Sequence, residues 1–130
     1  MTDPKMIDRW VDDTLDIVEF ATGPADSTWG AVRAELGHPE PFDMPYIGLG
    51  NEENTKTFEA NFPVFRDAIE ERFPDITIIS NSGPDDAGVR FDELWDFNRK
   101  QGVAMVDEHY YNDPGWFLSN HTRYDSYDRE

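Results

Sequence analysis

Ile76-Thr77-Ile78-Ile79-Ser80-Asn81 is the stretch that decides the fold of this chain. It is short, rich in β-branched residues and bounded by Pro74 and Gly83, which is typical of a buried strand. Residues 45–50 and 103–106 are two further apolar stretches that predict strands on either side of it along the chain. Three short strands of this kind are expected to share one sheet.

Helical periodicity separates the predicted strands. The first helix should begin at Asp3-Pro4, where a capping residue is followed by proline. Pro63 lies among phenylalanines at helical spacing and should confine residues 55–60 to a separate first turn. Residues 112–121 are expected to form a loop. The expected helices, in chain order, cover residues 4–20, 29–36, 62–72, 91–102 and 122–129.

Alternation of helices with near-continuous apolar strands predicts an α/β fold with parallel strands and right-handed crossovers. Three strands are few for a sheet that must be covered on both sides, which favours a barrel sector or a small three-layer domain. The 130 residues suffice for one modest domain. A complete (β/α)8 barrel typically needs about 250 residues. We therefore expect one partial domain over residues 1–130.

The composition excludes several classes of function. Asp and Glu total 28 against 11 Lys and Arg, and the net charge of −17 argues against nucleic acid or anionic membranes as partners. We expect a soluble acidic surface, with adaptation to high salt as the alternative. The chain has no cysteine and no HExxH spacing, so neither a metal nor another cofactor is expected. No apolar run could span a bilayer and no secretory signal is visible, so we expect a cytoplasmic protein.

Polar clusters follow all three predicted strands. Asn51-Glu52 follows the first strand, Ser80-Asn81-Ser82 ends the second, and residues 107–111 follow the third. Because the carboxyl ends of parallel strands meet at the same edge of a sheet, all three clusters are expected to face one rim. This coincidence favours a functional site at that rim.

Two of these features also have plain structural interpretations. Glu52 precedes a predicted helix, whose dipole an acidic residue would meet favourably. Gly48 and Gly50, however, leave room beside the strand end, as a binding pocket needs. Trp116 and Phe117 follow a Pro-Gly pair and could form either a hydrophobic plug or a platform for a sugar.

Alternation along the third strand sorts the residues that follow it. His109 and Tyr111 should share one face, and Asp107 should lie deeper on that face. His109 could be a core histidine satisfied by Asp107, which we expect to orient the imidazole ring. Glu108 alternates away from His109 and is expected to point outward.

The stretch Tyr46-Ile47-Gly48-Leu49-Gly50-Asn51-Glu52 resembles the fourth-strand end of clan A glycoside hydrolases. Three further stretches make the resemblance more specific, because in combination they are similar to family 51 α-L-arabinofuranosidases. Together these motifs cover nearly the whole chain. The resemblance implies a partial (β/α)8 TIM barrel sector that lacks the first three and last two strands. The three stretches are Gly37-His38-Pro39-Glu40-Pro41, residues 106–111, and Pro114-Gly115-Trp116-Phe117-Leu118 with residues 123–129.

The resemblance also implies a role for each site residue in a retaining α-L-arabinofuranosidase that acts on arabinose-containing polysaccharides and oligosaccharides. Glu52 would be the general acid/base, and Asn51 would hydrogen-bond the sugar near its 2-hydroxyl. His109 and Tyr111 would line the arabinose subsite. The family's nucleophile is a glutamate beyond the stretch that ends at Arg129, so the isolated chain is expected to be inactive.

Two other functions stay open. The chain could be a non-catalytic fragment that associates with itself or with a complementary chain through exposed strand edges. It could also come from another clan A glycosidase, such as a xylanase.

Gly48 departs from the family pattern, which often has a glutamate there, and a supporting contact could be lost with that side chain.

Overall fold

The computed structural model describes residues 4–53 and 56–127. The predicted cap Asp3, the turn residue Thr55 and the predicted helix end at Arg129 lie outside these residues. No helix in the described part is long and apolar enough to cross a membrane. The elements are α1 (Pro4–Thr22), α2 (Thr28–Glu35), β1 (Tyr46–Gly48), α3 (Lys56–Arg72), β2 (Thr77–Asn81), α4 (Val89–Gln101), β3 (Met105–Asp107), α5 (Pro114–Ser119) and a 3₁₀ helix, η1 (Arg123–Ser126).

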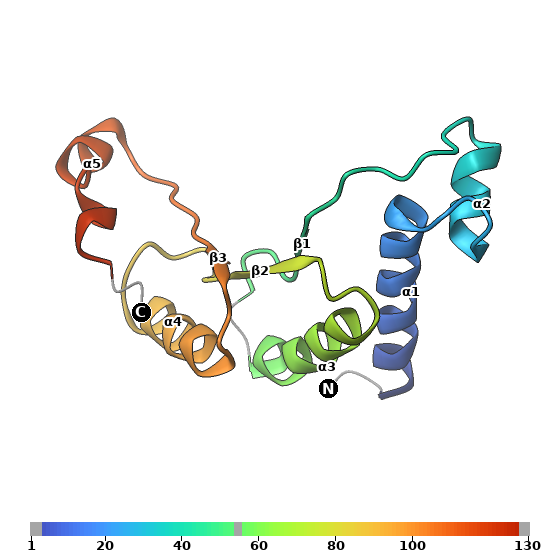
Figure 1. Cartoon of the computed structure of the whole chain (residues 1–130). Helices are drawn as coiled ribbons and strands as arrows, with labels where there is room; N and C mark the ends of the chain where they lie inside the picture. Colours follow the sequence, from blue (N-terminus) through green and yellow to red (C-terminus); the bar gives the residue numbers. More distant parts are fainter. Residues whose placement is uncertain (1–3, 54–55, 128–130) are drawn as a thin grey trace.

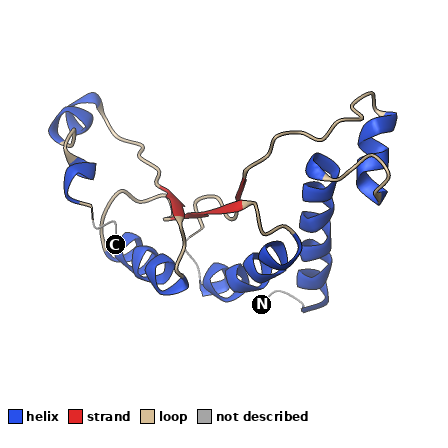
Figure 2. Ribbon diagram, viewed as in Figure 1, coloured by secondary structure: helices blue, strands red, loops and turns tan. Residues whose placement is uncertain are grey.

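The three strands form one parallel sheet in the order β1-β2-β3, which confirms the predicted α/β class and strand direction. Figures 1 and 2 show α3 and α4 together beneath one face of this sheet, with α1 and α2 at one end and α5 at the other. Among the described residues, no helix covers the opposite face. One-sided cover fits a barrel sector better than a three-layer domain, because helices surround only the outside of a barrel.

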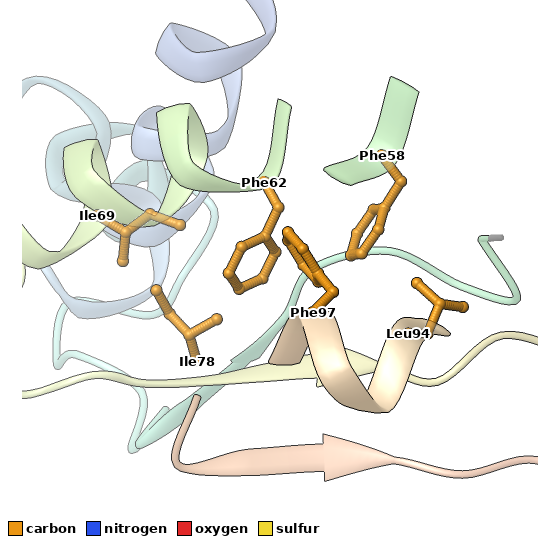
Figure 3. Close-up of a cluster of buried hydrophobic side chains, with 6 residues drawn as sticks. All are labelled: Phe58, Phe62, Ile69, Ile78, Leu94 and Phe97. Carbon is orange, nitrogen blue, oxygen red and sulfur yellow. The ribbon is translucent and has the colours of Figure 1, made fainter. Parts of the chain in front are cut away.

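Aromatic packing fixes the two crossover helices on the sheet. Phe62 lies 5.6 Å from Phe58 and 5.7 Å from Phe97, measured between ring centroids, and the contact with Phe97 is edge-on. These rings join α3 to α4 on the face of β2 that the two helices cover (Figure 3). The buried cluster consists of Phe58, Phe62, Ile69, Ile78, Leu94 and Phe97, none more than 9% exposed.

Helix α3 runs unbroken from Lys56 to Arg72, so the prediction that Pro63 separates a first turn from the main helix was wrong. A proline in a helix interior removes one hydrogen bond and clashes with the preceding turn, at a cost of about 3 kcal/mol. Phe58 lies before Pro63 and Ile69 lies after it, yet both are buried in the same core. Packing on both sides of the proline therefore holds the helix together.

The segment after β3 also differs from the prediction. Residues 114–119, expected to be a loop, form helix α5. The Asp113 carboxylate accepts hydrogen bonds from the backbone N–H of Gly115 at 2.7 Å and of Trp116 at 3.0 Å, and Pro114 occupies the first turn. Where the last predicted helix is described, at residues 122–127, the structure has the 3₁₀ turn η1 in place of an α-helix.

Arg33 of α2 is fully buried and fastens this helix to α1. Its guanidinium donates to the carbonyl oxygens of Phe20 at 2.7 Å and Ala21 at 3.3 Å, in the last turn of α1. It also donates to the carbonyls of His38 at 2.9 Å and Pro39 at 3.1 Å. The cation thus neutralises the negative end of α1 and holds the segment that leads into β1.

Candidate active site

The connection after β1 bends sharply to present Glu52. Gly50 has φ +86°, and Glu52 is the one non-glycine residue with positive φ among those described, at +56°. A Cβ on Gly50 would lie 2.7 Å from the ring of Phe58 and 2.8 Å from the side-chain nitrogen of Asn81. Only glycine fits this close approach to the core. Backbone strain of the kind seen at Glu52 tends to gather at functional sites.

Glu52 and His109 meet across the sheet although 57 residues separate them in the chain. The Nδ1 atom of His109 lies 2.9 Å from Oε1 of Glu52, and its Nε2 atom lies 3.1 Å from Oδ2 of Asp107. A neutral imidazole carries one N–H and could donate to one carboxylate only, whereas the imidazolium can donate to both. The predicted orienting contact from Asp107 to His109 is therefore present.

The electrostatics of this group hold Glu52 in its ionised form. Hydrogen bonds from His109 and then Tyr111 lower the pKa of the Glu52 carboxyl below its ordinary value. Hydrogen bonds to Glu52 and then Asp107 raise the pKa of the His109 imidazole. The described residues thus favour the carboxylate form of Glu52 and the imidazolium form of His109.

Tyr111 joins the same face of the strand end, as the alternation predicted. Its ring stands edge-on to His109 with the centroids 6.4 Å apart, and its hydroxyl bonds to Glu52, which raises the Tyr111 pKa. Tyr111 is 79% exposed, so a ligand could reach it. Asn51 is exposed beside Glu52, but its side chain makes no hydrogen bond to another described residue.

The cluster that ends β2 is buried, and two of its residues bond to the neighbouring elements. Ser80, Asn81 and Ser82 are all at most 3% exposed. Ser82 donates to the Asp107 carbonyl through its backbone N–H at 3.0 Å and its hydroxyl at 3.1 Å. Asn98 of α4 donates to the carbonyl of Asn81 at 3.0 Å. These bonds tie the end of β2 to β3 and α4, and so set the distance across which Glu52 and His109 face each other.

Glu108 does not point outward into solvent as expected, because its side chain is only 5% exposed. It accepts hydrogen bonds from the hydroxyls of Tyr110 and Tyr127, the latter at 2.5 Å, and lies 3.4 Å from the guanidinium of Arg123. Burial and the bond to Glu108 raise the pKa of Tyr127 to about 12. Alternation gave the correct side of the strand, but it carries no information on the distant residues that cover that side.

Trp116 packs on Tyr110 and Arg123, two of the residues that surround Glu108, which supports the plug interpretation for Trp116. Its ring packs on Tyr110 with centroids 5.2 Å apart, and the Arg123 guanidinium lies over both rings. Phe117, by contrast, is 49% exposed. Sequence reasoning missed Arg123 and Tyr127 as partners of Glu108, because no local pattern links residues 15 and 19 positions apart.

Known proteins resemble this chain along most of its length. Residues 1–129 match the family model described as α-L-arabinofuranosidase 1 domain. An extracellular exo-α-L-arabinofuranosidase of Streptomyces chartreusis is 59% identical over 128 residues, which are 98% of this chain and 16% of that protein. α-L-Arabinofuranosidase 1 of Arabidopsis thaliana is 52% identical over 73 residues, which are 55% of this chain and 11% of that protein.

Solved structures give the same result at the level of the fold. The arabinose-bound MgGH51 α-L-arabinofuranosidase superposes with a TM-score of 0.80 at 27% identity, over 99% of this chain and 20% of that one. The arabinose complex of the Thermotoga maritima α-L-arabinofuranosidase gives 0.66 at 20% identity, over 88% and 25% of the two chains, and supports the fold alone. The chain belongs to the α-L-arabinofuranosidase 1 domain family and forms a three-strand sector of a family 51 glycoside hydrolase barrel.

Proposed function

We propose that the complete protein is a retaining α-L-arabinofuranosidase that releases arabinose from polysaccharides and oligosaccharides. The observation that carries this proposal is the meeting of Glu52, His109 and Tyr111 at one rim of a parallel sheet. Glu52 serves as the general acid/base. Asn51 binds the sugar near its 2-hydroxyl, and His109 and Tyr111 line the arabinose subsite.

Retention requires a second carboxyl group about 5–5.5 Å from the acid/base. Among the described residues, the hydrogen-bond partners that lower the pKa of Glu52 are the imidazole of His109 and the phenol of Tyr111. A negatively charged nucleophile brought close to Glu52 would raise that pKa by repulsion and allow Glu52 to carry a proton. Asp107 is occupied by His109. The nucleophile is therefore expected from chain beyond the 130 residues, and these residues alone should not turn over substrate.

The test compares the complete protein with the 130-residue chain on 4-nitrophenyl α-L-arabinofuranoside. The complete protein should release nitrophenol and the chain alone should not. Glu52→Gln in the complete protein should lower kcat by roughly 10²–10⁴, the usual contribution of a general acid/base. Glu53→Gln is the matched control, because Glu53 is the neighbouring exposed glutamate, and it should retain activity.

Two further readouts sharpen this test. Azide needs no base to attack a glycosyl intermediate, so it should restore turnover to the Glu52→Gln variant. A panel of aryl pyranosides separates this activity from that of a xylanase-like enzyme. Full activity of Glu52→Gln, or a preference for xylopyranosides, would show that the proposed assignment is wrong.

Self-association is a second candidate, favoured by the surface beside β1. This strand is an edge of the described sheet. A groove of about 560 Å³ adjoins it, lined by Trp10, Ile17, Ile47, Phe58 and other residues of α1, β1 and α3. Trp10 is 44% and Ile17 63% exposed, so an associating strand would bury apolar surface there. Light scattering of the 130-residue chain would show a species larger than the monomer, which Ile17→Lys should abolish.

The cytoplasmic location stays a proposal. It rests on the lack of cysteine in these residues, which fits a reducing compartment, whereas the Streptomyces chartreusis relative is named as extracellular. Detection of the complete protein in the culture medium of intact cells would contradict it.

A further inference from the structure

His109 is held between two carboxylates that belong to different strands. Its Nδ1 faces Glu52, from the connection after β1, and its Nε2 faces Asp107, the last residue of β3. Among the described residues, Tyr111 is the other titratable group in contact with the His109 ring; its own ring stands edge-on to it, and its hydroxyl interacts with Glu52. The end of β2 places Asn81 opposite Asp107, and asparagine does not titrate. The charge on His109 is therefore controlled by Glu52 and Asp107.

We propose that Asp107 is a positioning residue for Glu52 and acts through His109; the inference rests on the proposed role of Glu52 as acid/base. By accepting the Nε2–H of His109, Asp107 keeps Nδ1 directed at the Glu52 carboxyl. One proton can then be shared between Oε1 and Nδ1. When Glu52 holds it, His109 is neutral with its other proton on Nε2; when His109 holds it, Glu52 is a carboxylate and His109 donates from both nitrogens.

This arrangement suits both halves of a retaining reaction. Glu52 must first give a proton to the leaving oxygen and later take one from water. The total charge of Glu52, His109 and Asp107 is the same whichever of Glu52 and His109 holds the shared proton. Without an acceptor at Nε2, neutral His109 would carry its proton on Nδ1 and donate it to Glu52. That tautomer would stabilise the carboxylate and oppose the acid form.

The Asp107 side chain is not needed for the fold, which makes the inference testable. It is 58% exposed, whereas the bonds that tie β3 to β2 use the Asp107 backbone carbonyl. Asn at this position keeps an acceptor oxygen and removes the charge, and Ala removes both. The matched control is Asp12→Asn, an exposed aspartate on α1.

The experiment is a pH titration of the 130-residue chain with ¹⁵N-labelled histidine, followed by NMR. Neutral His109 of the wild type should carry its proton on Nε2. Asp107→Asn should keep this tautomer but titrate at lower pH, because a carboxylate charge is lost. Asp107→Ala should move the proton to Nδ1 and titrate lower still, while Asp12→Asn should leave His109 unchanged.

Three results would overturn the inference. They are a wild-type tautomer protonated at Nδ1, a His109 titration unmoved by both Asp107 variants, and an equal shift caused by Asp12→Asn. If Asp107→Ala fails to fold, the titration of Asp107→Asn decides alone. Because the readout is a tautomer rather than turnover, inactivity of the complete protein on arabinofuranosides would count against the proposed function and leave the role of Asp107 standing.

Discussion

Substitution of Gly50 by alanine should damage both the fold and the site, because Gly50 combines two constraints. Its φ of +86° is unfavourable for a residue with a Cβ, at a cost of roughly 1–2 kcal/mol. The new Cβ would lie 2.7 Å from a ring carbon of Phe58 and 2.8 Å from the side-chain nitrogen of Asn81, where real contacts do not occur. Both neighbours are buried, so relief would require movement in the core, which typically costs about 1–3 kcal/mol.

Together these costs predict a loss of about 2–5 kcal/mol in the free energy of unfolding. Urea denaturation followed by tryptophan fluorescence measures it, and a slope of about 2 kcal/mol per M converts the loss into a midpoint lower by about 1–2.5 M. Gly50 also lies two residues before Glu52, so a backbone shift should weaken the contact with His109. The ¹⁵N titration of His109 should therefore move to lower pH.

Gly48→Ala is the matched control, because a Cβ on Gly48 meets no atom within 4 Å and its φ is not positive. It should change stability by no more than about 0.5 kcal/mol. Equal stability of the Gly50→Ala and Gly48→Ala variants would refute the steric reasoning. A destabilised Gly50→Ala variant with an unshifted His109 titration would refute the link from this turn to the site.

Three further predictions follow from the packing and the charges. Phe62→Ala should lower the free energy of unfolding by about 3–5 kcal/mol in urea, whereas Val64→Ala, 44% exposed on the same helix, should change it far less. Arg33→Met should cost roughly 3 kcal/mol or more, because four carbonyl oxygens lose a charged donor, and Arg9→Met should cost little. His109→Gln removes the stabilisation that the ion pair of His109 with Glu52 gives to the folded state. This loss should be largest between the ordinary pKa values of 4.5 for Glu and 6.5 for His. It should disappear as the pH rises through the raised pKa of His109, or falls through the lowered pKa of Glu52. Urea midpoints of wild type and variant across this pH range measure it; a constant difference at all pH values would contradict the ion pair.

Much of the fold was predictable because the signals are local. The β-branched stretch at 76–81 and the apolar stretches at 45–50 and 103–106 place all three strands, although β1 and β3 are each only three residues long. The α5 helix was missed although Asp113-Pro114 is the same start signal that was used at Asp3-Pro4. A six-residue helix has too little periodicity to be recognised.

In the site, only the positions that follow from side-chain alternation and parallel strand direction were predictable. These two rules bring Glu52, His109 and Tyr111 to one rim, and the structure places them in contact. They could not reveal that the Glu108 side chain is buried beside Arg123, or that Ser82 at the end of β2 bonds to the backbone of β3, because both are tertiary contacts. They also could not reveal the positive φ of Glu52 or the close approach of Gly50 to the ring of Phe58.

The most direct measurement of the shared rim is the ¹⁵N titration of His109 in the Glu52→Gln variant of the 130-residue chain. If the ends of β1 and β3 meet as described, removal of the Glu52 charge lowers the pKa of His109, and Glu53→Gln leaves it unchanged. A His109 pKa that is the same in wild type and Glu52→Gln would mean that these two strand ends do not share a site.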